Sequence, residues 1–110
     1  VPLNGNVLSK IYNPGKFFIA FHHKASEFNE NTSVLFEEDN GNKFKIKQIA
    51  GIVARRIINY MEPAMRVERG QRLGFIRFGS RVDIIVPSNF NINIKVGEKV
   101  VGSKTLIGYF

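Results

Sequence analysis

The chain has 110 residues, enough for one domain with a modest hydrophobic core and too few for two. Hydrophobic residues make up 44% and charged residues 23%, which excludes a disordered chain, and the lack of cysteine excludes disulfides and cysteine-based metal sites. No uncharged apolar run approaches the ~18 residues of a membrane span, and no signal peptide pattern opens the chain. The net charge of +7 indicates attraction to an anionic partner, either nucleic acid or anionic lipid. The alternative interpretation is a basic surface that is only solvated.

Turn signals recur at short intervals along the chain, and the runs between them are rich in Ile, Val and Phe. This pattern is typical of an all-β sandwich or barrel. The turn signals are Asn4-Gly5, Asn13-Pro14-Gly15, Asn40-Gly41, Arg69-Gly70, Pro87-Ser88, Gly97 and Gly102.

The clearest predicted hairpin joins Ser33–Glu38 to Lys43–Gln48 through Asp39-Asn-Gly-Asn. Alternation in the second strand places Phe44 and Ile46 toward the core and its three lysines toward water.

Two stretches are ambiguous. Ala25–Asn29 fits a single helical turn in a loop. Ile49–Tyr60 matches a helical template, yet it is rich in Ile and Val and contains Gly51, which weakens a helix interior. We predict strands interrupted near Gly51, because the neighbouring hairpin offers an edge for pairing.

Further along, Asn91–Val96 alternates regularly, with Ile92, Ile94 and Val96 on one face, and predicts a strand. A weak internal repeat is also present. Val67-Glu-Arg-Gly-Gln-Arg-Leu-Gly and Ile94-Lys-Val-Gly-Glu-Lys-Val-Val-Gly share an apolar residue, a glycine turn, a basic residue and a second glycine. Such turns resemble those of barrel-sandwich-hybrid domains, so we expect a mainly β, barrel-sandwich-hybrid-like fold made of duplicated β-hammerheads.

Gly79-Ser80 lies between a run that reads as a strand, Gly74–Phe78, and another that starts at once, Val82–Val86. By itself the dipeptide predicts only a bulge or tight bend. Glycine also lets the backbone bend so that the Ser80 Oγ can approach the preceding carbonyl, and serine supplies a nucleophile. The dipeptide thus places a flexible backbone position directly before a nucleophilic side chain.

Val67–Asp83 as a whole resembles the carboxy-terminal catalytic region of the phosphatidylserine decarboxylases in their short form. Four further segments follow in the same order as in that family, and together they span nearly all 110 residues. They are Asn13-Pro-Gly-Lys-Phe-Phe, Asn29-Glu-Asn-Thr-Ser, Gln48-Ile-Ala-Gly-Ile-Val-Ala-Arg-Arg-Ile and Ile94-Lys-Val-Gly-Glu-Lys-Val.

The resemblance implies that the chain is cut between Gly79 and Ser80, giving the products 1–79 and 80–110 of one domain. Ser80 would become a pyruvoyl group, a covalent cofactor that forms a Schiff base with the substrate amino group. The implied reaction is decarboxylation of phosphatidylserine to phosphatidylethanolamine. The implied partners are phosphatidylserine and an anionic membrane surface on the cytoplasmic side of the cell membrane. The two chains from one precursor would stay associated. No nucleic acid partner is implied, and a homo-oligomer is possible.

The family also has a histidine and a catalytic aspartate upstream of the stretch that corresponds to Val1–Gly5. This chain starts after both and lacks an initiator methionine, so we interpret it as part of a longer protein. The fragment alone is then expected to lack the residue that handles protons.

Other candidate residues have weaker cases. Gly102-Ser103 repeats the dipeptide but is followed by Lys-Thr, so we interpret it as a turn, and Lys104 as a surface lysine rather than a carrier lysine. His22 and His23 would point to opposite faces of a strand, and no cluster of Asp, Glu and His with ligand spacing accompanies them. We interpret them as loop or surface histidines and predict no metal.

Arg55 and Arg56, at the end of an apolar run, could receive a lipid phosphate or lie at a solvated strand end. Asp83 could orient the cleavage bond or pair with a neighbouring arginine. The rival hypothesis for the whole chain is a non-catalytic basic β-domain that binds an anionic partner. Its basic residues, however, are scattered rather than clustered with stacking aromatics.

Overall fold

The computed structural model of the chain describes residues 1–15, 29–51, 57–76 and 80–110. The described residues form strands joined by turns and loops, and none of them is helical. The strands are β1 (Gly5–Asn13), β2 (Asn31–Glu38), β3 (Lys43–Ile49), β4 (Ile57–Asn59), β5 (Arg66–Val67), β6 (Gly74–Ile76), β7 (Arg81–Ile85), β8 (Asn91–Ile92) and β9 (Gly108–Tyr109). The expectation of a mainly β protein is confirmed for this part of the chain.

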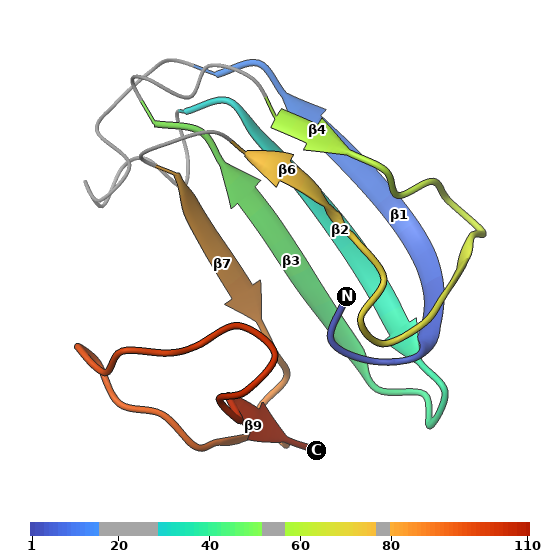
Figure 1. The fold of residues 1–110 in the computed structure, drawn as a ribbon. Helices are drawn as coiled ribbons and strands as arrows, with labels where there is room; N and C mark the ends of the chain where they lie inside the picture. Colours follow the sequence, from blue (N-terminus) through green and yellow to red (C-terminus); the bar gives the residue numbers. More distant parts are fainter. Residues whose placement is uncertain (16–28, 52–56, 77–79) are drawn as a thin grey trace.

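Five strands form one antiparallel sheet in the order β5-β1-β2-β3-β7, and it curls like half a barrel (Figure 1). At its centre lies the predicted hairpin of β2 and β3, in which Phe36 pairs with Phe44 and Glu37 with Lys43. Gly41, with a φ of 91°, lies in the turn between the two strands. The hairpin prediction is therefore confirmed.

The core lies on one face of this sheet. Phe36 and Phe44 stack there with their ring centroids 5.0 Å apart, and Ile46 is buried as alternation predicted. Val7, Val34, Met61 and Val67 complete the buried cluster. Each fully buried side chain of this size stabilises the fold by about 1.5–3 kcal/mol relative to leaving it exposed.

A second layer covers the core. The two-stranded pair of β4 and β6 lies across the sheet (Figure 1), and Leu73 and Met65 from the neighbouring loops pack against the core. Val1 joins them, because its amino group donates to the Gln71 carbonyl oxygen at 2.7 Å. This layer places β6, which leads toward Gly79, over the sheet that contains β7.

The stretch Ile49–Tyr60 contains strand where it is described. Ile49 ends β3, Ala50 and Gly51 are outside any strand, and β4 begins at Ile57. The choice of interrupted strands over a helix is confirmed for these residues, whereas residues 52–56 lie outside the described part. Residues 25–28 of the predicted helical turn lie outside it as well.

The prediction of a strand over Asn91–Val96 is wrong beyond Ile92. Strand β8 is only Asn91–Ile92, paired with β9, and a turn follows in which the Glu98 amide donates to the Lys95 carbonyl oxygen at 3.1 Å. Val96 is fully exposed in that turn. Gly97, with a φ of 87°, favours a turn here over the strand that alternation suggested.

The internal repeat appears in the structure as two matching turns. Gly70 and Gly97 have φ values of 88° and 87°. In each turn the residue after the glycine donates its amide to the carbonyl oxygen three residues back, Gln71 to Glu68 and Glu98 to Lys95. The side chains of Gln71 and Glu98 accept the reverse bond from the same two residues, at 3.0 and 3.3 Å.

Candidate functional site

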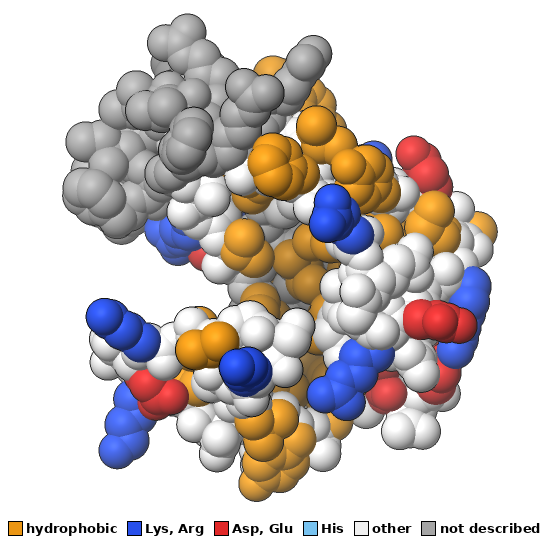
Figure 2. All heavy atoms as spheres, in the orientation of Figure 1, with side chains coloured by type: hydrophobic (Ala, Val, Ile, Leu, Met, Phe, Trp, Pro, Cys, Tyr) orange, Lys and Arg blue, Asp and Glu red, His pale blue; other side chains and the backbone are white. Residues whose placement is uncertain are grey.

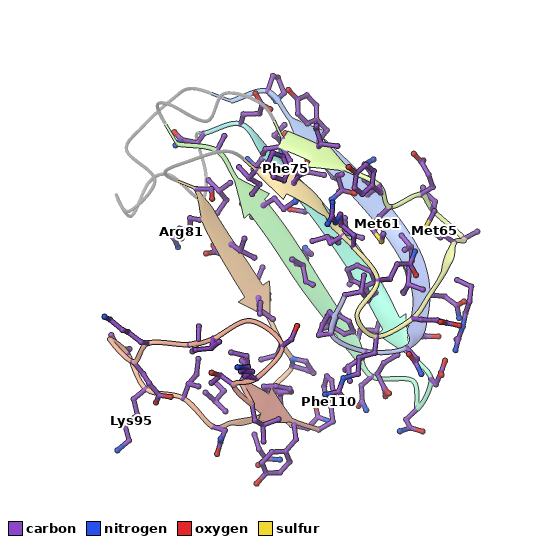
Figure 3. All side chains as sticks on the ribbon, viewed as in Figure 1. Met61, Met65, Phe75, Arg81, Lys95 and Phe110 are labelled. Atoms are coloured by element: carbon purple, nitrogen blue, oxygen red, sulfur yellow. The ribbon has the colours of Figure 1, made fainter. Side chains whose placement is uncertain are left out.

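Ser80 lies between two strand pairs that belong to different sheets. Upstream, β6 pairs with β4, so that Ile76 is opposite Ile57. Downstream, β7 begins directly after Ser80 and pairs with β3, so that Arg81 is opposite Ile49. Ser80 itself is exposed, and Gly79 lies outside the described residues. Figure 3 shows Arg81 at the start of β7 and Phe75 on β6.

Arg81 and Asp83 project from the same side of β7 and form an ion pair. The Arg81 Nε donates to Asp83 Oδ1 at 2.7 Å, and a second guanidinium nitrogen lies 3.3 Å from Oδ2. Both side chains are partly buried. The interpretation of Asp83 as an ion-pair partner of a neighbouring arginine is confirmed.

An amide network lies beside this junction, where β4 and β6 approach β3. Asn59 Nδ2 donates to Gln48 Oε1 at 2.8 Å, and Asn59 Oδ1 accepts from the Met61 amide at 2.9 Å. Gln48 is opposite Val82, two residues after Ser80, and Asn59 is opposite Gly74. No local pattern predicts this network, because Gln48 lies in one of the segments that resemble the family and Asn59 lies in none of them.

A second buried polar group lies at the same end of the sheet. Asn29 Nδ2 donates to the Ala50 carbonyl oxygen at 2.7 Å, and Asn31 Nδ2 donates to the Asn29 carbonyl oxygen at the same distance. Glu30 Oε1 accepts from the Ile57 amide at 3.2 Å. Because β4 starts at Ile57, these contacts fix the beginning of that strand against the start of β2.

The repeated dipeptide at Gly102-Ser103 lies in a turn, as interpreted from the sequence. The amides of Lys104 and Thr105 both donate to the Val101 carbonyl oxygen, at 3.1 and 3.0 Å, and Ser103 has a φ of 62°. Lys104 is exposed. Hydrogen bonds within the turn account for the conformation of this segment.

The remaining candidates fall outside the described residues, namely His22, His23, Arg55 and Arg56. Among the residues that are described, no three His, Cys, Asp or Glu side chains gather as a metal site. The same part of the chain contains no helix long and apolar enough to cross a membrane.

Hydrophobic side chains also gather around the site. Figure 2 shows them in the middle of the view, where the surface is hollowed between the upper strands and the C-terminal segment. Val82 and Ile84 of β7 are opposite Gln48 and Ile46, on the core side of the sheet, yet they are 53% and 46% exposed. The core face is thus open along β7, next to Ser80.

Comparison with known proteins gives a consistent result. The profile of the phosphatidylserine decarboxylase family matches residues 1–108. The chain is 46% identical, over its full length, to the phosphatidylserine decarboxylase proenzymes of Rickettsia akari, Rickettsia felis and Rickettsia prowazekii. It spans about half the length of these curated relatives, 48% in each case. No solved structure matches it significantly. The chain therefore belongs to the phosphatidylserine decarboxylase family.

Proposed function

We propose that the complete protein decarboxylates phosphatidylserine to phosphatidylethanolamine and that Ser80 is the precursor of its pyruvoyl group. The observation that supports this proposal most directly is the location of Ser80. It is exposed between the β4–β6 pair and the β3–β7 pair, in a chain that matches the family over residues 1–108.

The chemistry of self-cleavage follows from the side chain of Ser80. Its Oγ attacks the Gly79 carbonyl carbon, and the peptide bond is replaced by an ester. Elimination across Cα–Cβ of residue 80 releases the Gly79 carboxylate and leaves dehydroalanine at the new amino terminus. Water then hydrolyses the tautomeric imine, ammonia leaves, and the ketone of the pyruvoyl group remains.

The residues present fit such a group. Ser80 is exposed, so a substrate amino group can reach it, and Arg81 holds position 80 by its pairing with Ile49. When formed, the pyruvoyl group supplies an electron-withdrawing carbonyl that accepts the electron pair left behind as carbon dioxide departs. The chain holds the group in place and keeps its surroundings open to the head group.

The strand pairing also explains how the two products, 1–79 and 80–110, would stay together. Five residues of β7 pair with β3, so the new amino terminus at residue 80 is anchored in the main sheet after the bond is broken. Upstream, Gly74–Ile76 of β6 pair with β4. Neither strand depends on the cleaved bond for its pairing.

For the fold type we propose duplicated β-hammerheads of the barrel-sandwich-hybrid class. The support is the pair of matching turns at Gly70 and Gly97, which share their φ angle and both of their hydrogen bonds.

For localisation we propose peripheral binding to the cytoplasmic side of the cell membrane, where phosphatidylserine would be both substrate and part of the anionic surface. The net charge of +7 favours such contact.

The proton-handling histidine and the aspartate implied by the family resemblance would come from residues outside this chain.

The test of the function is the replacement of Ser80 in the complete protein. Ser80→Ala should abolish both cleavage and decarboxylation, because alanine has no Oγ to attack Gly79 and no leaving group for elimination. Denaturing mass analysis measures cleavage, and release of carbon dioxide from phosphatidylserine measures activity.

Ser103→Ala is the matched control, since it alters the same dipeptide within the turn at Val101. It should leave cleavage and activity intact. A Ser80→Ala protein that still converts phosphatidylserine would have no route to the pyruvoyl group, and the proposal would be abandoned.

A further inference from the structure

One amide–amide contact connects the two strand pairs that flank the Gly79–Ser80 bond. Gln48 lies on β3, opposite Val82 of β7, and Asn59 lies on β4, opposite Gly74 of β6. The hydrogen bond of 2.8 Å from Asn59 Nδ2 to Gln48 Oε1 therefore joins the upstream pair to the downstream pair.

The surroundings hold this contact in place. Gln48 is only 4% exposed, and a Cβ atom at Gly74 would lie 2.9 Å from its Nε2 and 2.1 Å from the Ile58 carbonyl oxygen. Asn59 is fixed by its bond from the Met61 amide and by Lys10, whose Nζ lies 3.2 Å from the Asn59 carbonyl oxygen. Loss of Asn59 would leave the buried Oε1 of Gln48 without this hydrogen bond, which is costly.

We propose that Gln48 and Asn59 are positioning residues for self-cleavage at Gly79–Ser80, an inference that rests on the proposed function. They act through the strands rather than on the reacting atoms. Their contact sets where β6 ends at Ile76 relative to where β7 begins after Ser80. Approach of a nucleophile to a carbonyl requires such precision, because a misplacement of about 1 Å can cost on the order of a hundredfold in rate.

The test compares Gln48→Glu, Asn59→Asp and the double variant in the complete protein. Glutamate at 48 still accepts from Asn59 Nδ2. Aspartate at 59 still accepts from the Met61 amide, and Gln48 can turn its amide so that Nε2 donates to it. The double variant places two acceptors face to face without a donor.

The measurement is the rate of cleavage of newly made protein, followed by denaturing mass analysis below the melting temperature of every variant. Each single variant keeps a hydrogen bond between residues 48 and 59 and should cleave faster than the double variant. The double variant should be slower by about tenfold or more, well beyond the product of the single effects. Val67→Ala, a core change in β5, controls for instability and should cleave at the wild-type rate even though its Tm falls.

A double variant whose loss equals the product of the single losses would overturn the inference, as would a Val67→Ala protein that is slowed equally. If the double variant does not fold, Gln48→Met against Gln48→Glu decides, because methionine has nearly the same shape but is only a weak acceptor. Equal rates for these two would count against positioning. Failure of the wild-type protein to cleave would instead reject the proposed function itself.

Discussion

Asp39, in the turn between β2 and β3, is held by Arg66 of β5 through two side-chain hydrogen bonds, one of them 2.9 Å between Nη2 and Oδ2. The hydrogen bond and the charge of Arg66 lower the pKa of Asp39 below its ordinary value of 3.8. A carboxyl with a lowered pKa in the folded state stabilises the fold above its unfolded pKa. That contribution is lost as the pH falls through the folded-state pKa.

Arg66→Gln should therefore raise the pKa of Asp39 toward 3.8, as measured by NMR titration of the carboxyl carbon. Because both side chains are exposed to solvent, the effect on stability should be small and should weaken with added salt. Asp39→Asn should lower Tm slightly at neutral pH and leave it unchanged in strong acid. If the titration midpoint of Asp39 is the same in the Arg66→Gln variant as in the wild type, Arg66 does not lower the pKa of Asp39.

Local alternation was enough to predict which single residues of the central hairpin are buried. Phe44 and Ile46 are in the core because period-2 patterning decides the face of a strand. The same reasoning could not find Gln48 and Asn59, because their hydrogen bond joins two sheets and depends on how the pair of β4 and β6 lies over β3. Contacts made by the tertiary fold leave no local pattern in the sequence.

At the scale of the strands, Gly74 allows the close approach of β6 to β4 and β3. A Cβ atom there would lie 2.1 Å from the Ile58 carbonyl oxygen, which is backbone and cannot rotate away. Gly74→Ala should therefore lower the free energy of unfolding by about 1–3 kcal/mol, the usual cost of overpacking. Urea denaturation measures it.

Gly102→Ala provides the comparison, because nothing lies within 4 Å of a Cβ atom at that position and its φ is not positive. Its stability should stay within about 0.5 kcal/mol of wild type. Equal losses for the two variants would mean that the close contacts around Gly74 do not limit the pairing of β6.

Strand prediction succeeded where hydrophobic alternation and turn chemistry agreed, and it failed where they competed. In the hairpin of β2 and β3 both pointed to the same register. In Asn91–Val96 the alternating Ile and Val residues favoured a strand, but the glycine at 97 imposed a turn that starts at Lys95. The fully exposed Val96 shows which influence prevailed.

Considered as a whole, the molecule combines a net charge of +7 with an open hydrophobic face beside Ser80. The candidate site was located from the sequence through the family resemblance of Val67–Asp83, because the dipeptide Gly79-Ser80 alone predicts only a bulge or a bend. Its setting between two sheets could not be predicted, because that depends on the order β5-β1-β2-β3-β7 and on the separate pair of β4 and β6. The net charge and the open hydrophobic face both bear on how a lipid would approach Ser80.

If the basic residues face an anionic leaflet, the complete protein should bind vesicles more tightly as their phosphatidylserine content rises, and binding should weaken with added salt. Each lysine or arginine near the surface contributes roughly 1 kcal/mol. Lys95, Lys99 and Lys104, all exposed in the C-terminal segment, are suitable positions for charge reversal to glutamate. Co-sedimentation with vesicles measures binding, and cleavage at Ser80 reports that the variant is folded. If the bound fraction does not change with phosphatidylserine content, with ionic strength or with any of the three charge reversals, this surface does not face the membrane.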